Sequence, residues 1–133
     1  MSNYLNKSKQ NLNAGDILIR SGFPNSSVHC SYYAAVQYMF HLIFTKFGKT
    51  KDEFNAELSF YKKGTHVWAE KLVCDELEKI SFQEYKWFKK NFPEFKDIRV
   101  KSDYTEELID KQKGIEALEK SRLLIETLKS NLG

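Results

Sequence analysis

The stretch from Ser26 to Phe44, SSVHCSYYAAVQYMFHLIF, contains no aspartate, glutamate, lysine or arginine. Polar groups occur at only a few places along it. A helix that is apolar nearly all round has no side to present to water, so other helices must surround it. We therefore predict that this segment forms the buried centre of a helical bundle.

Three glycines divide the rest of the chain in a regular way. Gly22, Gly48 and Gly64 each follow a lysine or arginine within two residues. This order is typical of helix ends, where a cation meets the negative end of the helix dipole and glycine adopts the left-handed conformation. Neither a hairpin dipeptide nor sustained two-residue alternation is present. The sequence predicts an all-α protein, and its length of 133 residues predicts one domain over residues 1–133.

Apolar spacing and capping residues predict where the helices begin and end. Helices are expected over residues 2–20, from a cap at 25–27 to 47, over 65–80, from 81 to about 92 and over 105–132, with a weaker helical stretch over 50–62. Pro93 is expected to end or kink the helix that begins at Ser81, and to start a short continuation to about Lys101. Thr65 is the expected N-cap of one helix, and Ser81 with Glu84 forms a capping-box pattern at the next. The inward positions that we expect are Leu5, Leu12, Ile17, Leu18, Phe54, Leu58, Tyr61, Val67, Leu72, Val73, Leu77, Ile80, Phe82, Tyr85, Phe88, Phe92, Leu108, Ile115, Leu118, Ile125 and Leu132.

The composition places the chain among globular proteins. Charged residues make up 29% and hydrophobic residues 41% of it, which is not a disordered composition. The net charge of +3 is too small by itself to indicate a nucleic-acid-binding protein. Gln37 and His41 interrupt the longest apolar run, which is therefore a poor membrane span. We expect a soluble, cytoplasmic protein without a membrane contact.

The two cysteines, Cys30 and Cys74, lie in apolar surroundings on different expected helices. Such cysteines usually behave as small buried hydrophobic residues. No signal peptide accompanies them, so a disulfide is not expected, and two lone cysteines form no metal-binding motif.

The segment from Lys86 to Lys101 is locally basic, with six cations against two carboxylates and hence an excess of +4. Aromatic residues alternate with these cations. Cations beside exposed rings suit single-stranded RNA or a nucleotide, because phosphates and base faces both find partners. The alternative is that the lysines are solvated and the rings fill the core. The rings concerned are Tyr85, Trp87, Phe88, Phe92 and Phe95.

Arg99 stands between two apolar residues, Ile98 and Val100. An arginine in such a position normally has a carboxylate or phosphate partner. Asp103, four residues later, can be that partner on the same helix face. In that case Arg99 and Asp103 pair, Tyr104 packs beside them, and no chemistry follows. If the arginine is instead open, it can hold a phosphate, supported by Lys96 and Lys101.

The three histidines, His29, His41 and His66, show no ligand spacing, so we expect no metal site and no cofactor. A histidine on the central helix is more often a hydrogen-bonded core residue than a general base. His29 is nevertheless the first to test if the protein cleaves RNA. The sequence has no glycine-rich phosphate loop, nucleophile elbow or paired-carboxylate motif.

Three segments resemble the HEPN family of small helical proteins. NLNAGDILIRSGFPNSSVHCSYYAAVQYMFHLIF is similar to the family's first hairpin, whose second helix carries a Tyr-Tyr-Ala-Ala core. THVW is similar to its histidine-containing helix start, and DIRVKSDY to its Arg-x-x-x-Asp-Tyr segment. Together they extend over most of the chain, from about Leu12 to Leu128, in the family's order and spacing.

The resemblance implies an up-and-down bundle of four to five helices that pairs as a homodimer, with the arginine segments of two protomers meeting in a cleft. Active members cleave RNA without a metal, through an arginine followed four to six residues later by a histidine. Arg99 matches that arginine, but positions 103–105 are Asp, Tyr and Thr. Members of this subgroup are often encoded beside a small nucleotidyltransferase in toxin–antitoxin or related pairs, which makes such a protein an expected partner.

Three functions are compatible with these residues. The first is a dimeric HEPN protein of a toxin–antitoxin or defence system, binding a nucleotide or RNA phosphate through Arg99, Lys101, Asp103 and Lys96. The second is a metal-independent ribonuclease in which Arg99 orients the phosphate and Tyr104 or His29 replaces the missing histidine. The third is a non-catalytic dimerisation module with a buried polar network.

Overall fold

The computed structural model describes residues 3–60 and 64–133, apart from the side chains of residues 58–60. Its helices are α1 (Tyr4–Arg20), α2 (Pro24–Thr45), α3 (Lys51–Phe60), α4 (Thr65–Ile80), α5 (Phe82–Tyr104) and α6 (Lys111–Leu132). The described part of the chain is all-helical, as the sequence predicted. The number of helices exceeds the expected four or five, because the weaker stretch after Gly48 forms α3. The positions expected for Leu58 and Tyr61 lie outside the described side chains.

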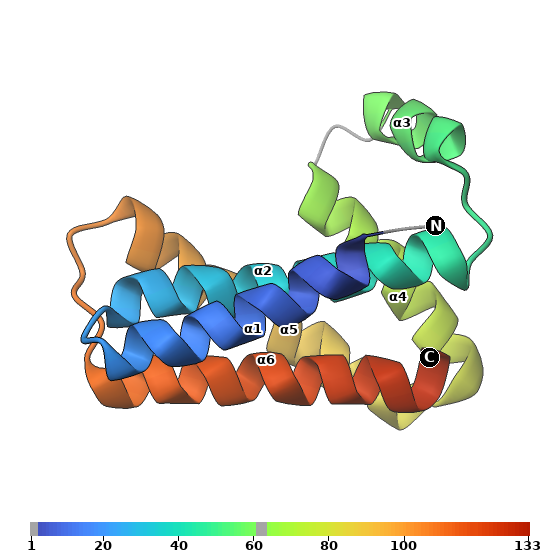
Figure 1. Ribbon diagram of the computed structural model, residues 1–133. Helices are drawn as coiled ribbons and strands as arrows, with labels where there is room; N and C mark the ends of the chain where they lie inside the picture. The colour runs from blue at the N-terminus through green and yellow to red at the C-terminus, as the bar shows by residue number, and fades with distance from the viewer. Residues whose placement is uncertain (1–2, 61–63) are drawn as a thin grey trace.

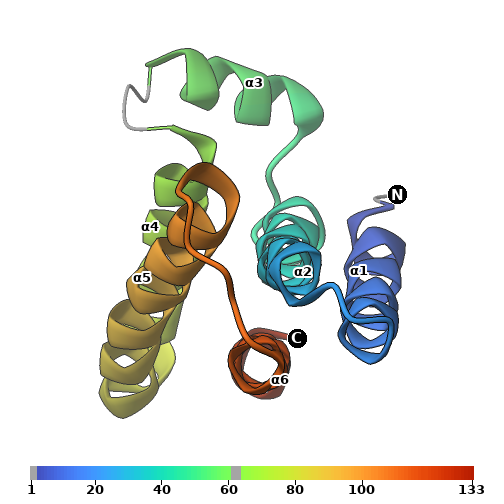
Figure 2. The ribbon, with the colours of Figure 1, turned by 90° about the vertical axis from the view of Figure 1, so that its left-hand side faces the viewer.

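Helix α2 lies at the centre of the bundle, which confirms the main prediction. It packs against α1, α4, α5 and α6. Figure 2 shows α1, α2 and α6 nearly end-on, with the pair α4 and α5 beside them and α3 set apart. The two described ends of the chain lie at the same end of the bundle (Figure 1). Within the described residues, no helix combines the length and apolar character that a bilayer span requires.

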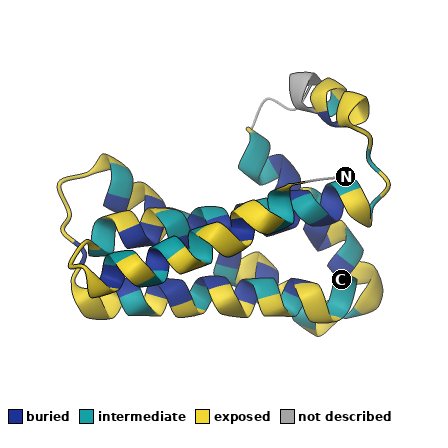
Figure 3. Cartoon of the chain, in the orientation of Figure 1, coloured by how far each residue is buried: buried dark blue, intermediate teal, exposed yellow. Residues whose placement is uncertain are grey.

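The core is continuous along α2, where Val28, Tyr32 and Met39 are completely buried. Figure 3 shows the buried residues facing the inside of the bundle and the exposed ones facing outward. Cys74 lies in this core, as expected, whereas Cys30 is only partly buried; both are free thiols.

Small residues allow α1 and α2 to approach closely. The hydroxyl of Ser8 donates to the carbonyl of Ala34, and the hydroxyl of Ser27 donates to the carbonyl of Gly15, both at 2.7 Å. A Cβ atom at Gly15 would stand 2.9 Å from Oγ of Ser31, so a larger residue at this position would force the side chain of Ser31 to move.

The inward face of α1 differs from the prediction. Ile19 is buried, whereas Ile17 is 57% exposed. Ser8, Gly15 and Ile19 share one side of the helix, because they are spaced by seven and four residues. Because this face includes polar and small residues, the spacing of apolar residues did not reveal it.

The first residue of α2 is Pro24, so the expected cap at residues 25–27 is wrong. Asn25 lies inside the first turn and holds two distant segments. Its Nδ2 donates to the carbonyl oxygens of Ser102 and Glu107 at 3.2 and 3.1 Å and to Oγ of Ser102 at 3.1 Å. Its Oδ1 accepts from the backbone N–H of Ile109 at 2.9 Å. This amide therefore joins the start of α2 to the end of α5 and to the loop that follows it.

Two caps agree with the sequence in part. Oγ of Ser81 accepts from the backbone N–H of Glu84 at 3.2 Å, as the capping-box pattern predicted. Helix α4 begins at Thr65, but its N-cap is Gly64. Ile80 and Phe82, expected inside, are 56% and 61% exposed, since both lie at the junction where α4 turns into α5.

Helix α5 continues through Pro93, so the helix end that the sequence allowed there is wrong. A proline inside a helix costs about 3 kcal/mol. Phe88 and Phe92 before the proline and Phe95 after it are completely buried on one face. Burying one such ring contributes about 1.5–3 kcal/mol, so a helix that keeps all three on the same face outweighs the proline.

Helix α6 begins at Lys111, six residues later than expected. Oδ1 of Asp110 caps it by accepting from the backbone N–H of Lys113 at 2.8 Å. The preceding loop presents Leu108 to solvent and buries Ile109, because Asn25 binds the backbone of Glu107 and Ile109. Over its 22 residues, α6 is about 33 Å long.

We expect Asn25→Ala to lower the free energy of unfolding by about 2 kcal/mol, since it leaves several partly buried donors and acceptors unpaired. Urea denaturation followed by circular dichroism measures this. Asn13→Ala, at an exposed position of α1, is the matched control and should change stability by about 0.5 kcal/mol or less. Equal denaturation midpoints for the two variants would contradict the role of Asn25.

Candidate functional site

Arg99 is buried on the inner side of α5. It is 6% exposed, whereas its neighbours Ile98 and Val100 are 37% and 36% exposed. The arrangement inverts what the residue types suggest, with the charged residue inside and the apolar ones outside. Arg99 follows Phe92 and Phe95 by seven and four residues, so the helix period points it to the same face.

Three tyrosine rings surround the Arg99 guanidinium. Its Cζ atom lies 4.7 Å from the ring centre of Tyr32, 5.7 Å from that of Tyr33 and 5.6 Å from that of Tyr104. Each distance is within the range of a cation–π interaction. Tyr32 is completely buried and Tyr104 is 73% exposed. The rings thus extend from the core to the surface, with the cation between them.

The carboxylate of Asp103 is the ionic partner of Arg99, but a distant one. Nη1 of Arg99 lies 3.8 Å from Oδ2 of Asp103, which is longer than a hydrogen bond. Nε of Arg99 is buried and has no hydrogen-bond partner within the described residues. A buried guanidinium with an unpaired donor is only partly compensated for the loss of water.

His29 binds the same carboxylate oxygen from α2. Its Nδ1 donates to Oδ2 of Asp103 at 2.8 Å, and its ring packs on that of Tyr33 at 4.7 Å between centres. The side chain is 51% exposed. Because Nδ1 is held by the carboxylate, Nε2 is the nitrogen that can exchange a proton with a bound molecule. Residues 74 positions apart thus form a histidine–carboxylate pair.

His66, on α4, also belongs to this group of side chains. Its Nδ1 lies 2.9 Å from the hydroxyl of Tyr32. Burial lowers the pKa of His66 to about 4, and the positive charges of Arg99 and Lys96 act in the same direction. Burial also raises the pKa of the Tyr32 hydroxyl, an effect that the charge of Arg99 and the contact of its guanidinium with this hydroxyl both oppose. At neutral pH, His66 and Tyr32 are therefore uncharged.

We name these residues the Arg99 cluster. It consists of side chains from α2, α4 and α5, namely His29, Tyr32, Tyr33, His66, Arg99, Asp103 and Tyr104.

The two lysines predicted to support Arg99 have different positions. Lys96 is on the α4 side of α5, where its charge acts on His66 and opposes the burial that raises the pKa of Glu70. Lys101 lies on the other side of α5 and lines a hollow against α6, together with Ile109 and Lys113. The structure therefore places Lys96 near the Arg99 cluster and Lys101 away from it.

The rings of the basic segment mostly belong to the core. Phe88, Phe92 and Phe95 are completely buried, so they cannot stack on a base. Lys86, Lys89 and Lys90 are exposed. For these residues the structure agrees with the alternative in which lysines are solvated and rings fill the interior.

An open hollow of about 390 Å³ lies beside His29. Its lining residues are Asn25, Ser26, His29, Cys30, Ser102 and Asp103. Burial raises the pKa of the Cys30 thiol, and the charge of Asp103 raises it further, so Cys30 is a poor nucleophile. Of the residues described, no group of three or more His, Cys, Asp or Glu side chains could hold a metal ion.

The fold brings together the three residues that the sequence suggested for catalysis, Arg99, Tyr104 and His29. Sequence reasoning did not place Tyr32, Tyr33 or His66 beside Arg99. Tyr32 and Tyr33 belong to the Tyr-Tyr-Ala-Ala segment, and His66 to THVW. These segments carried a resemblance but no statement of contact, since contacts between α2, α4 and α5 depend on packing.

Comparison with known proteins adds no identification, because this chain matches no protein-family model, no curated protein and no solved structure.

The position of His66 predicts a pH dependence of stability. The pKa of His66 is about 4 in the folded protein and near 6.5 in an unfolded chain. Between pH 4 and pH 6.5 the imidazole of His66 therefore binds a proton more readily in the unfolded state than in the folded state. Stability is then full above about pH 6.5 and falls as the pH decreases toward 4. We expect the urea midpoint to fall less between pH 7 and pH 4 in His66→Gln than in the wild type, measured by circular dichroism. Equal falls in the two proteins would contradict this assignment.

Proposed function

We propose that this chain is a HEPN-like protein that binds a nucleotide or RNA phosphate at the Arg99 cluster. The observation that carries the proposal is the incompletely paired guanidinium of Arg99, with a buried Nε that has no described partner and a carboxylate at 3.8 Å. An arginine presents donors in a fixed fork that matches phosphate oxygens. The exposed ring of Tyr104 can stack on a base at the same place.

Access to Arg99 requires a movement of Tyr104. This ring is exposed and lies on the last residue of α5, whereas Tyr32 and Tyr33 on the opposite side belong to α2. Rotation of an exposed side chain is fast and inexpensive compared with any change in the core. A phosphate would then approach from the side of Tyr104 and His29.

We further propose that two copies of the chain pair at the C-terminal end of α5. Val100 and Tyr104 near the end of α5 and Leu108 in the loop after it expose apolar surface, and Leu108 is 87% exposed. A second copy that covers these residues would form a cleft with two Arg99 residues. A toxin–antitoxin or defence setting, with a small nucleotidyltransferase as partner, belongs to this proposal and rests on the family resemblance.

Binding should be measured by fluorescence anisotropy of a labelled single-stranded RNA at low salt. We expect the affinity to fall linearly with salt on a logarithmic scale, because phosphate contacts release counterions. Arg99→Ala should weaken binding by about tenfold or more, and Arg99→Lys should weaken it less, because the charge remains but the fork is lost.

Arg122→Ala is the matched control, since Arg122 is exposed on α6 and pairs with Glu119 at 2.8 Å. Its RNA affinity should equal that of the wild type. Absence of RNA and nucleotide binding by the wild-type protein at low salt would refute the proposal.

The third function, a purely structural module, gives a different result in the same variant. If Arg99 and Asp103 were the only members of the network, loss of Arg99 would leave Asp103 unpaired. In this structure His29 remains 2.8 Å from the Asp103 carboxylate, so Asp103 keeps a partner. If Arg99 acts only through packing, Arg99→Ala should lower the melting temperature strongly, and the wild type should bind no RNA. A folded Arg99→Ala variant that has lost RNA binding supports a functional arginine instead.

The pair of His29 and Asp103 favours a second candidate, a metal-independent ribonuclease. Nε2 of His29 would accept the proton of a ribose 2′-hydroxyl, whose oxygen attacks the neighbouring phosphorus. The bond from phosphorus to the 5′-oxygen breaks, and the hydroxyl of Tyr104 would donate a proton to that oxygen. Asp103 would hold the histidine in the required tautomer, and Arg99 would stabilise the charge of the transition state.

This candidate predicts cleavage of RNA in the presence of a chelator, followed on gels with an end-labelled oligonucleotide. His29→Ala should slow cleavage by about 100-fold, because a positioned general base contributes that much or more. His41→Ala is the control, because His41 lies on the same helix outside the Arg99 cluster and should keep the wild-type rate. Intact RNA after prolonged incubation with the wild type would exclude ribonuclease activity.

A further inference from the structure

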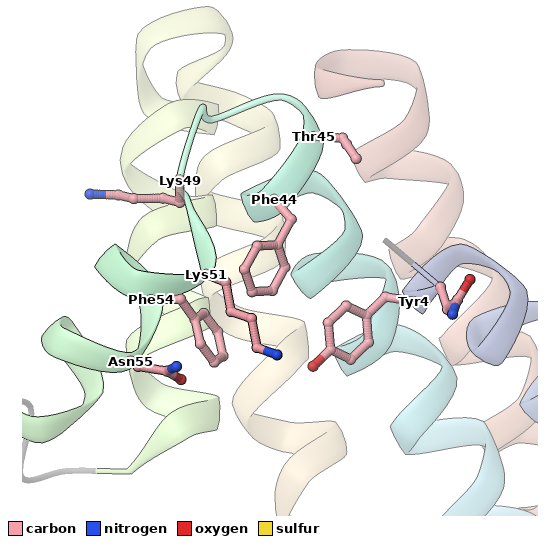
Figure 4. A pocket seen from close by; sticks show the side chains of 8 residues that line it. Tyr4, Phe44, Thr45, Lys49, Lys51, Phe54 and Asn55 are labelled. Carbon is pink, nitrogen blue, oxygen red and sulfur yellow. The ribbon is translucent and has the colours of Figure 1, made fainter. Parts of the chain in front are cut away.

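A second pocket lies far along α2 from the Arg99 cluster, where the start of α1, the end of α2 and α3 meet. Its volume is about 560 Å³, which is within the usual range for sites that hold small molecules. The residues that line it are Asn3, Tyr4, Phe44, Thr45, Lys49, Lys51, Phe54 and Asn55. Figure 4 shows three aromatic rings facing one space between these elements.

The aromatic rings offer flat apolar surfaces. Tyr4 and Phe44 are nearly parallel, at 10° with their centres 5.7 Å apart, and Phe44 and Phe54 are 4.7 Å apart at 40°. Two aromatic rings in an offset stack or an edge-to-face contact gain about 0.5–1.5 kcal/mol beyond the burial of their surface. The pocket therefore suits a flat aromatic ring.

The charges that line the pocket are positive. Lys49 and Lys51 belong to the lining, which includes no carboxylate. Lys49 bonds to Oε1 of Glu57, and Figure 4 shows its side chain extending away from the rings. Lys51 forms no hydrogen bond or ion pair with the described residues, and its ammonium group lies between the ring of Phe54 and the hydroxyl of Tyr4 (Figure 4).

Helix α3 forms one wall of the pocket, and among its described side chains Phe54 and Glu57 attach it to the bundle. Phe54 is nearly buried and packs edge-on against Trp68 at 5.0 Å. Oε2 of Glu57 accepts from Nε1 of Trp68 at 3.1 Å. Figures 1 and 2 show the remainder of α3 apart from the other helices. A ligand that contacts Phe54 and Lys51 would add to these attachments.

We propose that this pocket binds a small molecule with a flat aromatic ring and an anionic group, either a carboxylate or a phosphate monoester. The ring would lie against Tyr4, Phe44 and Phe54, and the anion would pair with Lys51. This site is independent of the Arg99 cluster and requires no nucleic acid.

Isothermal titration calorimetry with two pairs of probes tests the proposal. Indole-3-acetate and indole-3-acetamide differ in the charge of a carboxylate, and AMP and adenosine differ in the charge of a phosphate. We expect at least one anionic probe to bind with a dissociation constant below millimolar and its neutral partner to bind more weakly. The probe that binds distinguishes a carboxylate ligand from a nucleotide.

Variants locate the bound probe. Lys51→Gln should weaken the anionic probe about fivefold and leave its neutral partner unchanged, since one exposed ion pair is lost. Phe44→Leu keeps an apolar side chain without a ring and should weaken both members of the pair about fivefold. Lys46→Gln is the matched control, because Lys46 is an exposed lysine after α2 outside the pocket lining, and it should leave both affinities unchanged.

Hydrogen exchange gives a second measurement, in which the bound probe should slow exchange of the α3 amides. The proposal is wrong if neither anionic probe binds at millimolar concentration, or if binding is unaffected by both Lys51→Gln and Phe44→Leu. AMP binding that is lost in Arg99→Ala but kept in Lys51→Gln would assign AMP to the Arg99 cluster and refute the phosphate form of this proposal. Binding of indole-3-acetate without any RNA binding would support this pocket and contradict the function proposed for the Arg99 cluster.

Discussion

The absence of charge along α2 is the constraint on which the rest of the structure depends. No side chain between Pro24 and Thr45 is an aspartate, glutamate, lysine or arginine, so most of this helix is unsuited to water. Helices α1, α4, α5 and α6 all pack against it. Tyr32, in the middle of α2, is completely buried as a result. The hydroxyl and ring of Tyr32 must therefore find partners on the surrounding helices, and they do so on α4 and α5.

Those partners explain why polar groups gather at one place in an apolar core. The hydroxyl of Tyr32 meets His66, and its ring lies under the Arg99 guanidinium. Several cation–π contacts, each of about 0.5–2 kcal/mol, hold the cation beside a carboxylate that His29 already binds. An arginine intended only for stability would be expected to form a short, two-bonded ion pair. The incomplete pairing of Arg99 is the observation on which the proposed phosphate site rests.

Much of the architecture could be predicted from local patterns, and the failures have identifiable causes. Apolar spacing located the helices and the buried α2, because helical periodicity is a property of neighbouring residues. Leu108 was expected on the face of the last helix, but Asn25 binds the backbone beside it and holds that segment as a loop. Pro93 was expected to break α5, but three buried phenylalanines keep the helix intact. Ile17 was expected inside, but the buried face of α1 consists of Ser8, Gly15 and Ile19. In each case a contact between distant segments outweighed the local preference.

The sequence by itself determined the helical class, the central position of α2 and the placement of Arg99 and Asp103 one helical turn apart, within reach of each other. Only the tertiary structure decided that His29 shares that carboxylate and that Tyr32 and Tyr33 lie against the guanidinium, with His66 bonded to Tyr32. It also decided that Lys101 faces away and that an aromatic pocket opens beneath α3. The physical reason is the range of the interactions. Turn-to-turn contacts follow from the helix period, whereas contacts between helices depend on how side chains interlock and on the path of the loops, which no local pattern encodes.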